Sequence, residues 1–425
     1  MIYNTTTFRD FHVSDFISKM LNWSDRFNIF CLLNSNGFTS KHGEWELIFA
    51  ADPAHILEIK DDQFVKPLQQ FSNEHEGWIF GHLNYPDQTN DRISFPNGFF
   101  FVPKILIRIK GNEVIISSKE EDPELIYDQL METAPLNGRA SILKEEIKSE
   151  MNESEYHSAI NAIKEHLQKG DCYEINFCQE FYSENADIHP ASLYHQLIQS
   201  SPSPFSAFYR LKEKFCISAS PERFLKKKAD RLISQPIKGT SKRNLIDAEK
   251  DLIGRQYLKE SQKEKSENVM IVDLVRNDLS KVSARGSVEV EELMGIYSFP
   301  QVHQMISTVV SILDNRFHWT EALDACFPMG SMTGAPKKRV MELINTYEKT
   351  ARGLFSGTIG YVDPQGDFDF NVVIRSYFYD RSTKKLSFKA GGGITINSNP
   401  EQEYKESLLK VEILRKLLEP EKDKP

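Results

Sequence analysis

Short runs of strand-forming residues, separated by clusters of Asn, Asp, Gly and Pro, constrain the fold of this chain more than any other feature. In the first third of the chain these runs lie at residues 27–33, 45–51, 78–80, 99–102, 105–107 and 114–116. Such runs favour strands, and the turn-forming residues between them favour antiparallel neighbours. No strand–helix–strand spacing repeats along the chain, which argues against a parallel, doubly wound sheet. The pattern therefore predicts antiparallel sheet.

The length of 425 residues suits two or three domains or one large one. Between about residues 120 and 150 the sequence becomes polar and helical, without the Gly, Ser or Pro richness of a flexible linker. We therefore expect a seam that divides an N-terminal portion of the sheet framework, residues 1–145, from a catalytic region, residues 146–425.

The charge pattern argues against a nucleic-acid-binding surface, because the net charge is −9 and Lys and Arg are scattered. We interpret the short cluster 226–228 as a solvated face. An odd number of cysteines without a Cys-x-x-Cys pair favours free thiols in a reducing cytoplasm; they are Cys31, Cys172, Cys178, Cys216 and Cys326. No signal-like start and no apolar stretch of membrane-spanning length is present, so we expect a cytoplasmic protein without a membrane contact.

Several elements of the second third carry polar candidates. Asn and Ser at the start and Gly170 at the end predict a helix over residues 152–169. In the following strand, residues 171–179, alternation places Glu174 on a polar face, where it could also simply meet solvent. Residues 247–279 predict one long helix with Glu267 on its apolar side, where a metal ligand and a structural ion pair are equally consistent.

Lys238 is predicted to lie at a strand-to-loop corner between Pro236 and Gly239. Taken alone, it is more consistent with an exposed surface lysine. To act as a nucleophile, its amine needs a pKa lowered by partial burial or by a nearby cation. Glu222, at the end of an earlier strand, is a plausible acid partner. His303 lies in a helix-like run and alone favours a core position.

The last third adds groups that suit anions and cations. Residues 327–338 form a glycine-bracketed loop with a proline at a helix start, which suits an anion but is no Walker A loop. Arg375 closes an apolar strand, as a carboxylate clamp or as an ordinary surface charge. Glu403, Glu406 and Lys410 share one helix face, which suits Mg²⁺ or an exposed ladder of Glu and Lys.

Together these segments resemble the chorismate-utilising enzymes over nearly the whole chain, most specifically from about residue 150 to 415. The motifs that carry the resemblance are Ser218-Ala219-Ser220-Pro221-Glu222-Arg223-Phe224-Leu225, Pro236-Ile237-Lys238-Gly239-Thr240, residues 267–278, residues 330–337, and residues 390–394 with the Glu-x-x-Glu-x-x-x-Lys pattern that follows. Each motif is modest alone, but their joint order is specific. The resemblance implies an α+β fold with two large, mainly antiparallel sheets packed together, helices outside and the site between the sheets.

The Pro-Ile-Lys-Gly-Thr motif resembles that of family members that aminate chorismate at C4, giving 4-amino-4-deoxychorismate for p-aminobenzoate and folate synthesis. Members that form anthranilate usually carry alanine where Lys238 stands. The resemblance implies that Lys238 attacks ring carbon C2 while the C4 hydroxyl leaves, protonated by Glu222, and that ammonia then adds at C4. For His303 it implies an electrostatic or positioning role near the ring.

The resemblance also implies ligands for a metal and for the substrate. Glu267 and Glu406, with Glu403 beside them, would bind Mg²⁺, which holds the ring carboxylate of chorismate. Tyr361 and Arg375 would bind the enolpyruvyl carboxylate. The other implied substrate-binding residues are Thr240, Ser331, Gly391, Gly392, Gly393 and Lys410.

Some features depart from the family or leave alternatives open. Glu174 falls where isochorismate-forming relatives place a base lysine and where aminating relatives commonly place glutamine. No cysteine lies in a Gly-x-Cys-x-Gly elbow, so we expect ammonia from a separate glutamine amidotransferase subunit. The alternatives are an anthranilate synthase large subunit, against which Lys238 argues; an isochorismate or salicylate synthase, against which Glu174 argues; and a catalytically silent binder of chorismate or an aromatic amino acid, against which Lys238 and Glu222 together argue.

Overall fold

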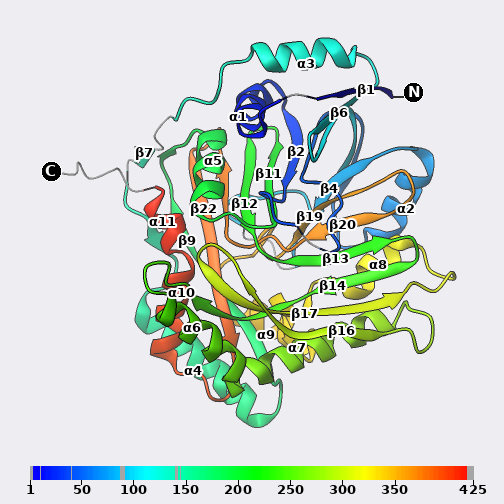
Figure 1. Cartoon of the computed structure of the whole chain (residues 1–425). Coiled ribbons are helices and arrows are strands. Elements are labelled where there is room, and N and C mark those ends of the chain that lie inside the picture. Colours follow the sequence, from blue (N-terminus) through cyan, green and yellow to red (C-terminus); the bar gives the residue numbers. More distant parts are fainter. Residues whose placement is uncertain are drawn as a thin grey trace.

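Two antiparallel layers of strands form the frame of the molecule (Figure 1). The structure, a computed structural model, describes residues 3–9, 11–39, 41–86, 91–138, 142–143 and 145–418. The first layer contains, in the order of hydrogen-bonded neighbours, β1 (Asn4–Phe8), β6 (Glu113–Ser118), β5 (Gly98–Lys110), β3 (Leu47–Ile59), β2 (Ile29–Asn34), β11 (Phe205–Leu211), β12 (Lys214–Ser220), β21 (Ser376–Asp380), β22 (Lys385–Ile394) and β9 (Glu174–Ser183).

The second layer is joined to the first through β5, which pairs with both β3 and β4. Its strands are, in order, β4 (Ile79–Leu83), β19 (Thr358–Val362), β20 (Phe368–Asn371), β13 (Arg223–Lys228), β14 (Arg231–Gln235) and β17 (Val302–Ile312). One edge of β17 pairs with β14 and then with β15 (Ile237–Lys242), and its other edge pairs with β16 (Glu289–Ser298). The short strands are β8 (Lys148–Ser149) and β18 (Gly334–Ala335), both on β9, and the separate pair β7 (Ile142–Leu143) and β10 (Ala186–Asp187).

Helices cover the outer faces of both layers (Figure 1). Those packed on the first layer are α1 (Val13–Trp23), α3 (Pro123–Glu132), α5 (Pro190–Ser200) and α11 (Glu412–Lys416). Those associated with the second layer are α2 (Val65–Glu74), α6 (Ala248–Glu260), α7 (Gln262–Ser280) and α8 (Trp319–Cys326). Helices α4 (Glu153–Lys169), α9 (Lys337–Tyr347) and α10 (Pro400–Lys410) pack beside β9 and β22, and short 3-10 turns lie at η1 (Ser24–Arg26) and η2 (Gly330–Met332).

Alternation along the strands divides the apolar side chains between two cores. In β2, Cys31 belongs to a cluster that draws on both layers, whereas Phe30 and Leu32 belong to the cluster under α1 and α5. Successive side chains of a strand point to opposite faces, so one strand feeds both cores. The predicted α+β fold with two large antiparallel sheets and outer helices is confirmed.

Local sequence signals predicted one helix well and two elements poorly. The predicted helix is α4, closed by a capping box between Asn152 and Glu155 and by Gly170 in a left-handed conformation. The single long helix over 247–279 is wrong, because Ser261 ends α6 and caps α7 by accepting a hydrogen bond from the Glu264 amide. The helix-like run around His303 is also wrong, since it is strand β17, rich in β-branched residues.

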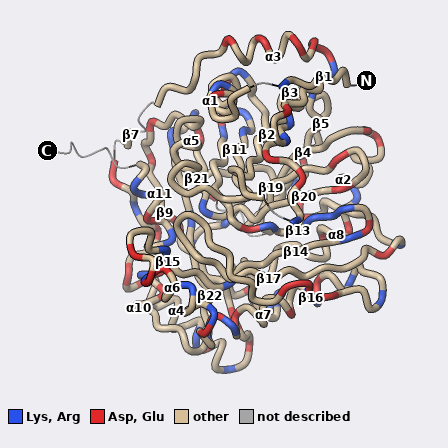
Figure 2. The backbone as a smooth tube through the Cα atoms, viewed as in Figure 1, with Lys and Arg blue, Asp and Glu red and all other residues tan. Residues whose placement is uncertain are grey.

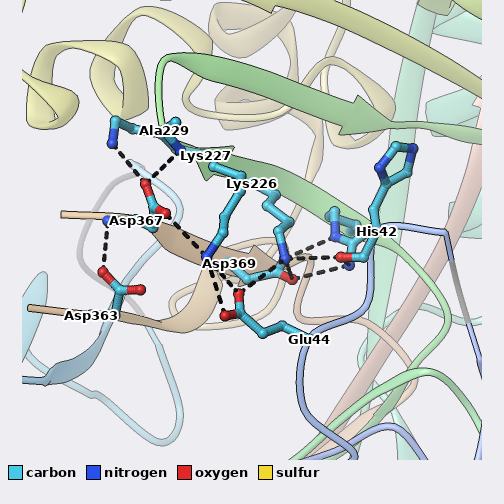
Figure 3. A network of polar contacts seen from close by, with 10 residues as sticks. His42, Glu44, Lys226, Lys227, Ala229, Asp363, Asp367 and Asp369 are labelled. Carbon is cyan, nitrogen blue, oxygen red and sulfur yellow. Dashed lines mark hydrogen bonds and ion pairs between the residues drawn. The ribbon is translucent and has the colours of Figure 1, made fainter. Parts of the chain in front are cut away.

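The lysine cluster 226–228 is not a solvated face. Lys226 is buried on β13, 3.7 Å from Asp369, and Lys227 donates to Asp367 at 3.0 Å. Figure 3 shows these contacts, and Figure 2 shows the basic run along β13. Because each lysine has acidic partners from a neighbouring strand or loop, the cluster is part of the framework.

Strands from the two predicted portions of the chain pair with each other, β2 with β11 and β4 with β19. The division at residue 145 stays a prediction. All five cysteines are buried and unpaired. Across the described ranges, no helix has the length and apolar character needed to cross a membrane.

Candidate active site

Lys238 lies on a bulge where β15 pairs with β17. The register shifts between Ile237 and Thr240, so β15 accommodates one more residue than its partner strand. Gly239 takes a φ of 99°, a left-handed angle that only glycine adopts without steric penalty. Bulges change the direction of a side chain, and here Lys238 points into the protein, with 9% of its surface exposed.

Glu174 on β9 accepts a hydrogen bond from the Lys238 ammonium, although the two residues are 64 positions apart. Glu174 is 3% exposed, so the alternative of a solvent-facing strand residue is wrong. Burial lowers the pKa of Lys238, but the negative charges of Glu174 and Glu267 outweigh it and raise that pKa above its usual value. The lowered pKa that a nucleophilic lysine needs is therefore absent in this structure, which favours the ammonium form of Lys238.

Glu222 lies between β12 and β13, and the structure brings it close to Lys238. Burial raises the pKa of Glu222 to about 7, and Ser331 and Lys238 limit the rise. The side chain is 4% exposed. A carboxyl group that keeps its proton near neutral pH suits a general acid. Two carboxyl groups thus act on one lysine: Glu174, which accepts its hydrogen bond, and Glu222, whose pKa is raised.

Arg375 follows β20 in a strained backbone conformation, with a φ of 51°. Left-handed angles in residues other than glycine cluster at functional sites. No residue in the described part of the chain forms a hydrogen bond or ion pair with its guanidinium group. Burial lowers the pKa of Arg375, and the charge of Glu222 acts in the opposite direction. An arginine with five available donors beside the acid is suited to a carboxylate ligand.

The triple glycine of β22 lets this strand pass close to both the sheet and the lysine. A Cβ on Gly391 would lie 2.0 Å from the carbonyl oxygen of Phe177 on β9. A Cβ on Gly393 would lie 3.0 Å from the Lys238 Nζ and 2.6 Å from the Glu174 Oε1. Any side chain at Gly393 would therefore occupy the space around the ion pair.

Glu403 and Glu406 of α10 lie beside Gly392 of this strand, and Lys263 connects Glu403 to Glu267 of α7. The Lys263 Nζ lies 3.9 Å from the Glu267 Oε1 and 3.8 Å from the Glu403 Oε1. The Lys410 Nζ lies 2.8 Å from the Glu406 Oε1. Two lysines thus offset part of the negative charge of the three carboxylates.

The chemistry of this group fits a hard divalent cation. The Glu267 Oε1 is buried without a hydrogen-bond partner among the described residues, and burial raises the pKa of Glu267 to about 7. From a Cβ built on Gly392, Glu403 and Glu406 oxygens would lie 3.5 and 3.6 Å away, so the glycine leaves room between them. Carboxylate oxygens are the ligands that Mg²⁺ takes. As the side chains stand, no three His, Cys, Asp or Glu groups in the described ranges are close enough to hold an ion.

Tyr361 is not placed with these groups. It lies on β19 and lines a separate cavity together with Trp45, Arg223 and Asp369. Its ring packs against Trp78, with ring centroids 5.4 Å apart. The structure therefore shows no contact between Tyr361 and the Lys238 group within the residues it describes.

His303 and Thr240 also take positions at the margin of the site. His303 contacts Ser298 at 2.8 Å and Asp251 at 3.2 Å, so it links β17 to α6. Thr240 is exposed on β15. Neither contacts Lys238 through a hydrogen bond or ion pair in the part of the chain that the structure describes.

Sequence reasoning missed two residues that organise the site. Lys263 is four positions before Glu267, and that helical spacing was a usable signal for their ion pair. Arg352 is buried, donates to the carbonyl oxygens of Met332 and Asn176, and pairs with Glu348. It fixes the loop that carries η2 against β9, and no local pattern marks it.

The family model and similar known sequences indicate the same family. Residues 29–416 match the family model described as chorismate binding enzyme. The chain is 35% identical over 409 residues to aminodeoxychorismate synthase component 1 of Bacillus subtilis, covering 90% of this chain and 85% of that protein. It is 40% identical over 273 residues to the protein of the same name from Escherichia coli, covering 64% of this chain and 59% of that protein. The match thus spans about three fifths of the length of the Escherichia coli relative.

Solved structures share the fold at lower identity. Anthranilate synthase component I from Streptococcus pneumoniae superimposes with a TM-score of 0.77 at 23% identity, covering 89% of this chain and 93% of that one. The isochorismate synthase MenF from Escherichia coli superimposes with a TM-score of 0.79 at 17% identity, covering 99% and 96%. At these identities the similarity establishes the architecture.

Proposed function

Because the chain belongs to the chorismate binding enzyme family, we propose that it is an aminodeoxychorismate synthase component that converts chorismate and ammonia into 4-amino-4-deoxychorismate. The observation that carries this proposal is Lys238, a buried amine that donates a hydrogen bond to Glu174 and interacts electrostatically with Glu222. A lysine in such a position can form a covalent intermediate. The names of the relatives in Bacillus subtilis and Escherichia coli support the assignment.

In the proposed reaction, the Lys238 amine attacks ring carbon C2, the ring double bonds shift, and the bond between C4 and its hydroxyl breaks. Glu222, which keeps its proton near neutral pH, gives that proton to the leaving hydroxyl. Ammonia then adds at C4 and expels Lys238 from C2, so the nitrogen stays at C4. Without the lysine, direct attack of ammonia is expected at C2, as in anthranilate formation.

Two groups of this site suit the two carboxylates of chorismate. The free guanidinium of Arg375 would bind the enolpyruvyl carboxylate through two parallel hydrogen bonds. Glu267, Glu403 and Glu406 would hold Mg²⁺, which when bound neutralises the ring carboxylate and keeps its own ligands ionised. The amides of the triple glycine at residues 391–393 would line the ring, since no Cβ blocks their approach.

A separate glutamine amidotransferase subunit would supply the ammonia. The relatives in Bacillus subtilis and Escherichia coli carry the designation component 1, which supports a second component. Five buried, unpaired thiols support a reducing compartment such as the cytoplasm.

Product analysis tests this function. The purified chain is incubated with chorismate, Mg²⁺ and ammonium, beside a Lys238→Ala variant, and the products are identified by chromatography and mass spectrometry. We expect aminodeoxychorismate from the wild type and none from the variant. Anthranilate from the wild type would replace the proposal by the anthranilate synthase alternative, and no turnover of chorismate by either protein would favour a silent binder.

A further inference from the structure

We propose that Glu174 is the base of the reaction: it takes a proton from Lys238 as the lysine attacks and returns it when the lysine leaves. This inference rests on the proposed function, because it assigns a role within the lysine mechanism. It assigns to Glu174 a task that neither the acid Glu222 nor the cation-binding carboxylates can perform.

The geometry singles out Glu174 among the acids of the site. Its Oε1 accepts the hydrogen bond from the Lys238 Nζ, whereas Glu222 and Glu267 act on Lys238 through their charge. A general base must lie within hydrogen-bonding distance of the proton that it removes. Among the described residues, Glu174 is the carboxylate that meets this condition.

The carboxylate is also held in place from both sides of its strand. On one edge of β9, Ala335 of β18 pairs with Glu174. On the other edge, β22 brings Gly393 so close that a Cβ there would collide with the Glu174 Oε1. Because two neighbouring strands fix the backbone and the glycine leaves space for the side chain, the ion pair is preformed.

In this chain, which carries Glu174 where aminating relatives commonly place glutamine, Glu174 is the acceptor for the proton balance of the first step. The structure holds Lys238 as an ammonium, which has no lone pair for attack. Transfer of one proton to Glu174 frees the amine, the bond from nitrogen to C2 forms, and the bond from C4 to oxygen breaks. The leaving hydroxyl takes its proton from Glu222, so water departs, Glu174 is neutral and Glu222 is ionised.

The second step restores the starting state. Ammonia forms a bond to C4, and the bond from C2 to the Lys238 nitrogen breaks with its electron pair on nitrogen. Glu174 returns its proton to the lysine, and Glu222 takes one from the new C4 ammonium group. One chorismate and one ammonia are consumed, one aminodeoxychorismate and one water are formed, and no other reactant is needed.

Glu222 cannot serve both purposes in one step. Burial raises the pKa of Glu222 to about 7, so near neutral pH a substantial fraction of Glu222 carries a proton to donate. Two carboxyl groups in opposite protonation states, set by different surroundings, are the arrangement that divides acid from base. Glu174, in contrast, already accepts the hydrogen bond of the Lys238 ammonium.

The test compares Glu174→Gln with the wild type across pH. We measure kcat/KM for aminodeoxychorismate formation at saturating ammonia between about pH 6 and about pH 9. The variant keeps the size and a hydrogen-bond acceptor of the side chain but cannot take the proton. We expect it to lose about 10²- to 10⁴-fold at neutral pH. The ratio of variant to wild type should then rise with pH, because the lysine must first lose its proton to solvent.

Two further variants separate catalysis from folding. Glu174→Asp keeps a carboxylate and should retain the pH profile of the wild type at a reduced rate. Glu165→Gln removes a negative charge from the exposed face of α4, far from any contact with Lys238, and should match the wild type. If Glu174→Gln fails to fold, the pH profile of Glu174→Asp provides the test. A Glu174→Asp profile that differs from that of the wild type would contradict a base at this position.

The possible outcomes are distinct. A ratio that stays flat with pH, or a Glu174→Gln variant as active as the wild type at neutral pH, would overturn the inference while aminodeoxychorismate from the wild type upholds the proposed function. Absence of this product from the wild type would remove the function and the inference together.

Discussion

The protonation state of Glu222 should make the activity depend on pH. Its pKa is raised to about 7 by burial, and the proposed reaction needs its protonated form. The protonated fraction falls as the pH rises through that value, so kcat/KM for chorismate should decline above about pH 7. The measurement is a pH profile of the wild type at saturating ammonia.

The matched variant is Glu222→Gln, which keeps the size of the side chain but has no carboxyl proton to give. It should lose about 10²- to 10⁴-fold in kcat/KM, and what remains should lack the decline near pH 7. A wild-type profile that stays level through pH 8 would show that Glu222 is not the acid.

Single residues also show where sequence reasoning succeeded and failed. The strand that ends before Pro236 could be read from local residues, but Lys238 lies inside the next strand, β15, and not at a strand-to-loop corner. The direction of the pKa shift of Lys238 could not be predicted from local residues. Its acidic neighbours come from β9 and α7, and no local pattern shows which carboxylates the fold will bring to a lysine.

At the scale of one element, strand β22 offers a sharp contrast between two glycines. Gly391→Ala should destabilise the protein, because the new Cβ would lie 2.0 Å from the backbone oxygen of Phe177. Gly393→Ala should fold but lose activity, because its Cβ meets the movable ends of Glu174 and Lys238. Thermal unfolding and product formation, measured for both variants, check the contrast. Equal loss of stability in the two would contradict it.

A lysine at the start of α7, Lys263, would compete with a cation for the same carboxylates. Lys263 lies within 4 Å of Glu267 and of Glu403 (3.9 and 3.8 Å). A divalent ion must compete with this charge, so Lys263→Met should bind Mg²⁺ about fivefold to tenfold more tightly in the absence of chorismate. Isothermal titration calorimetry measures the affinity directly.

Lys259→Met is the matched control for that measurement. Lys259 is exposed in the last turn of α6 and has no ion pair within the described residues, so its removal should leave the affinity for Mg²⁺ unchanged. Unchanged or weaker binding by Lys263→Met would show that the lysine does not compete with the cation.

Elements differed in how well the sequence predicted them, for physical reasons. Helix α4 carries its own start and stop signals in Asn152, Glu155 and Gly170, and these were sufficient. The break at Ser261 between α6 and α7 interrupts a continuous polar helical pattern with one capping side chain, which local propensity did not resolve. Residues 302–312 form strand β17 because they pair with β14, β15 and β16. These partners are distant in the sequence, so a local pattern could not reveal the pairing.

At the scale of the whole molecule, the site is assembled from both layers and from helices of the C-terminal half. β9 and β22 bring Glu174 and Gly393 from the first layer, β15 brings Lys238 from the second, and α7 and α10 bring the carboxylates. The order of motifs along the chain predicted most of this set. The order of motifs could not predict the placement of Tyr361. Its strand, β19, lies between β4 and β20, and the Tyr361 side chain lines a different cavity.

The central claim is that Lys238 forms a covalent bond with the substrate. We would incubate the protein with chorismate and Mg²⁺ without ammonia, digest it, and search by mass spectrometry for a peptide that carries chorismate less one water. The account predicts this adduct on Lys238, its absence in Lys238→Ala, and its conversion to aminodeoxychorismate when ammonium is added. Formation of aminodeoxychorismate by Lys238→Ala at the wild-type rate, with no adduct on the wild-type lysine, would contradict it.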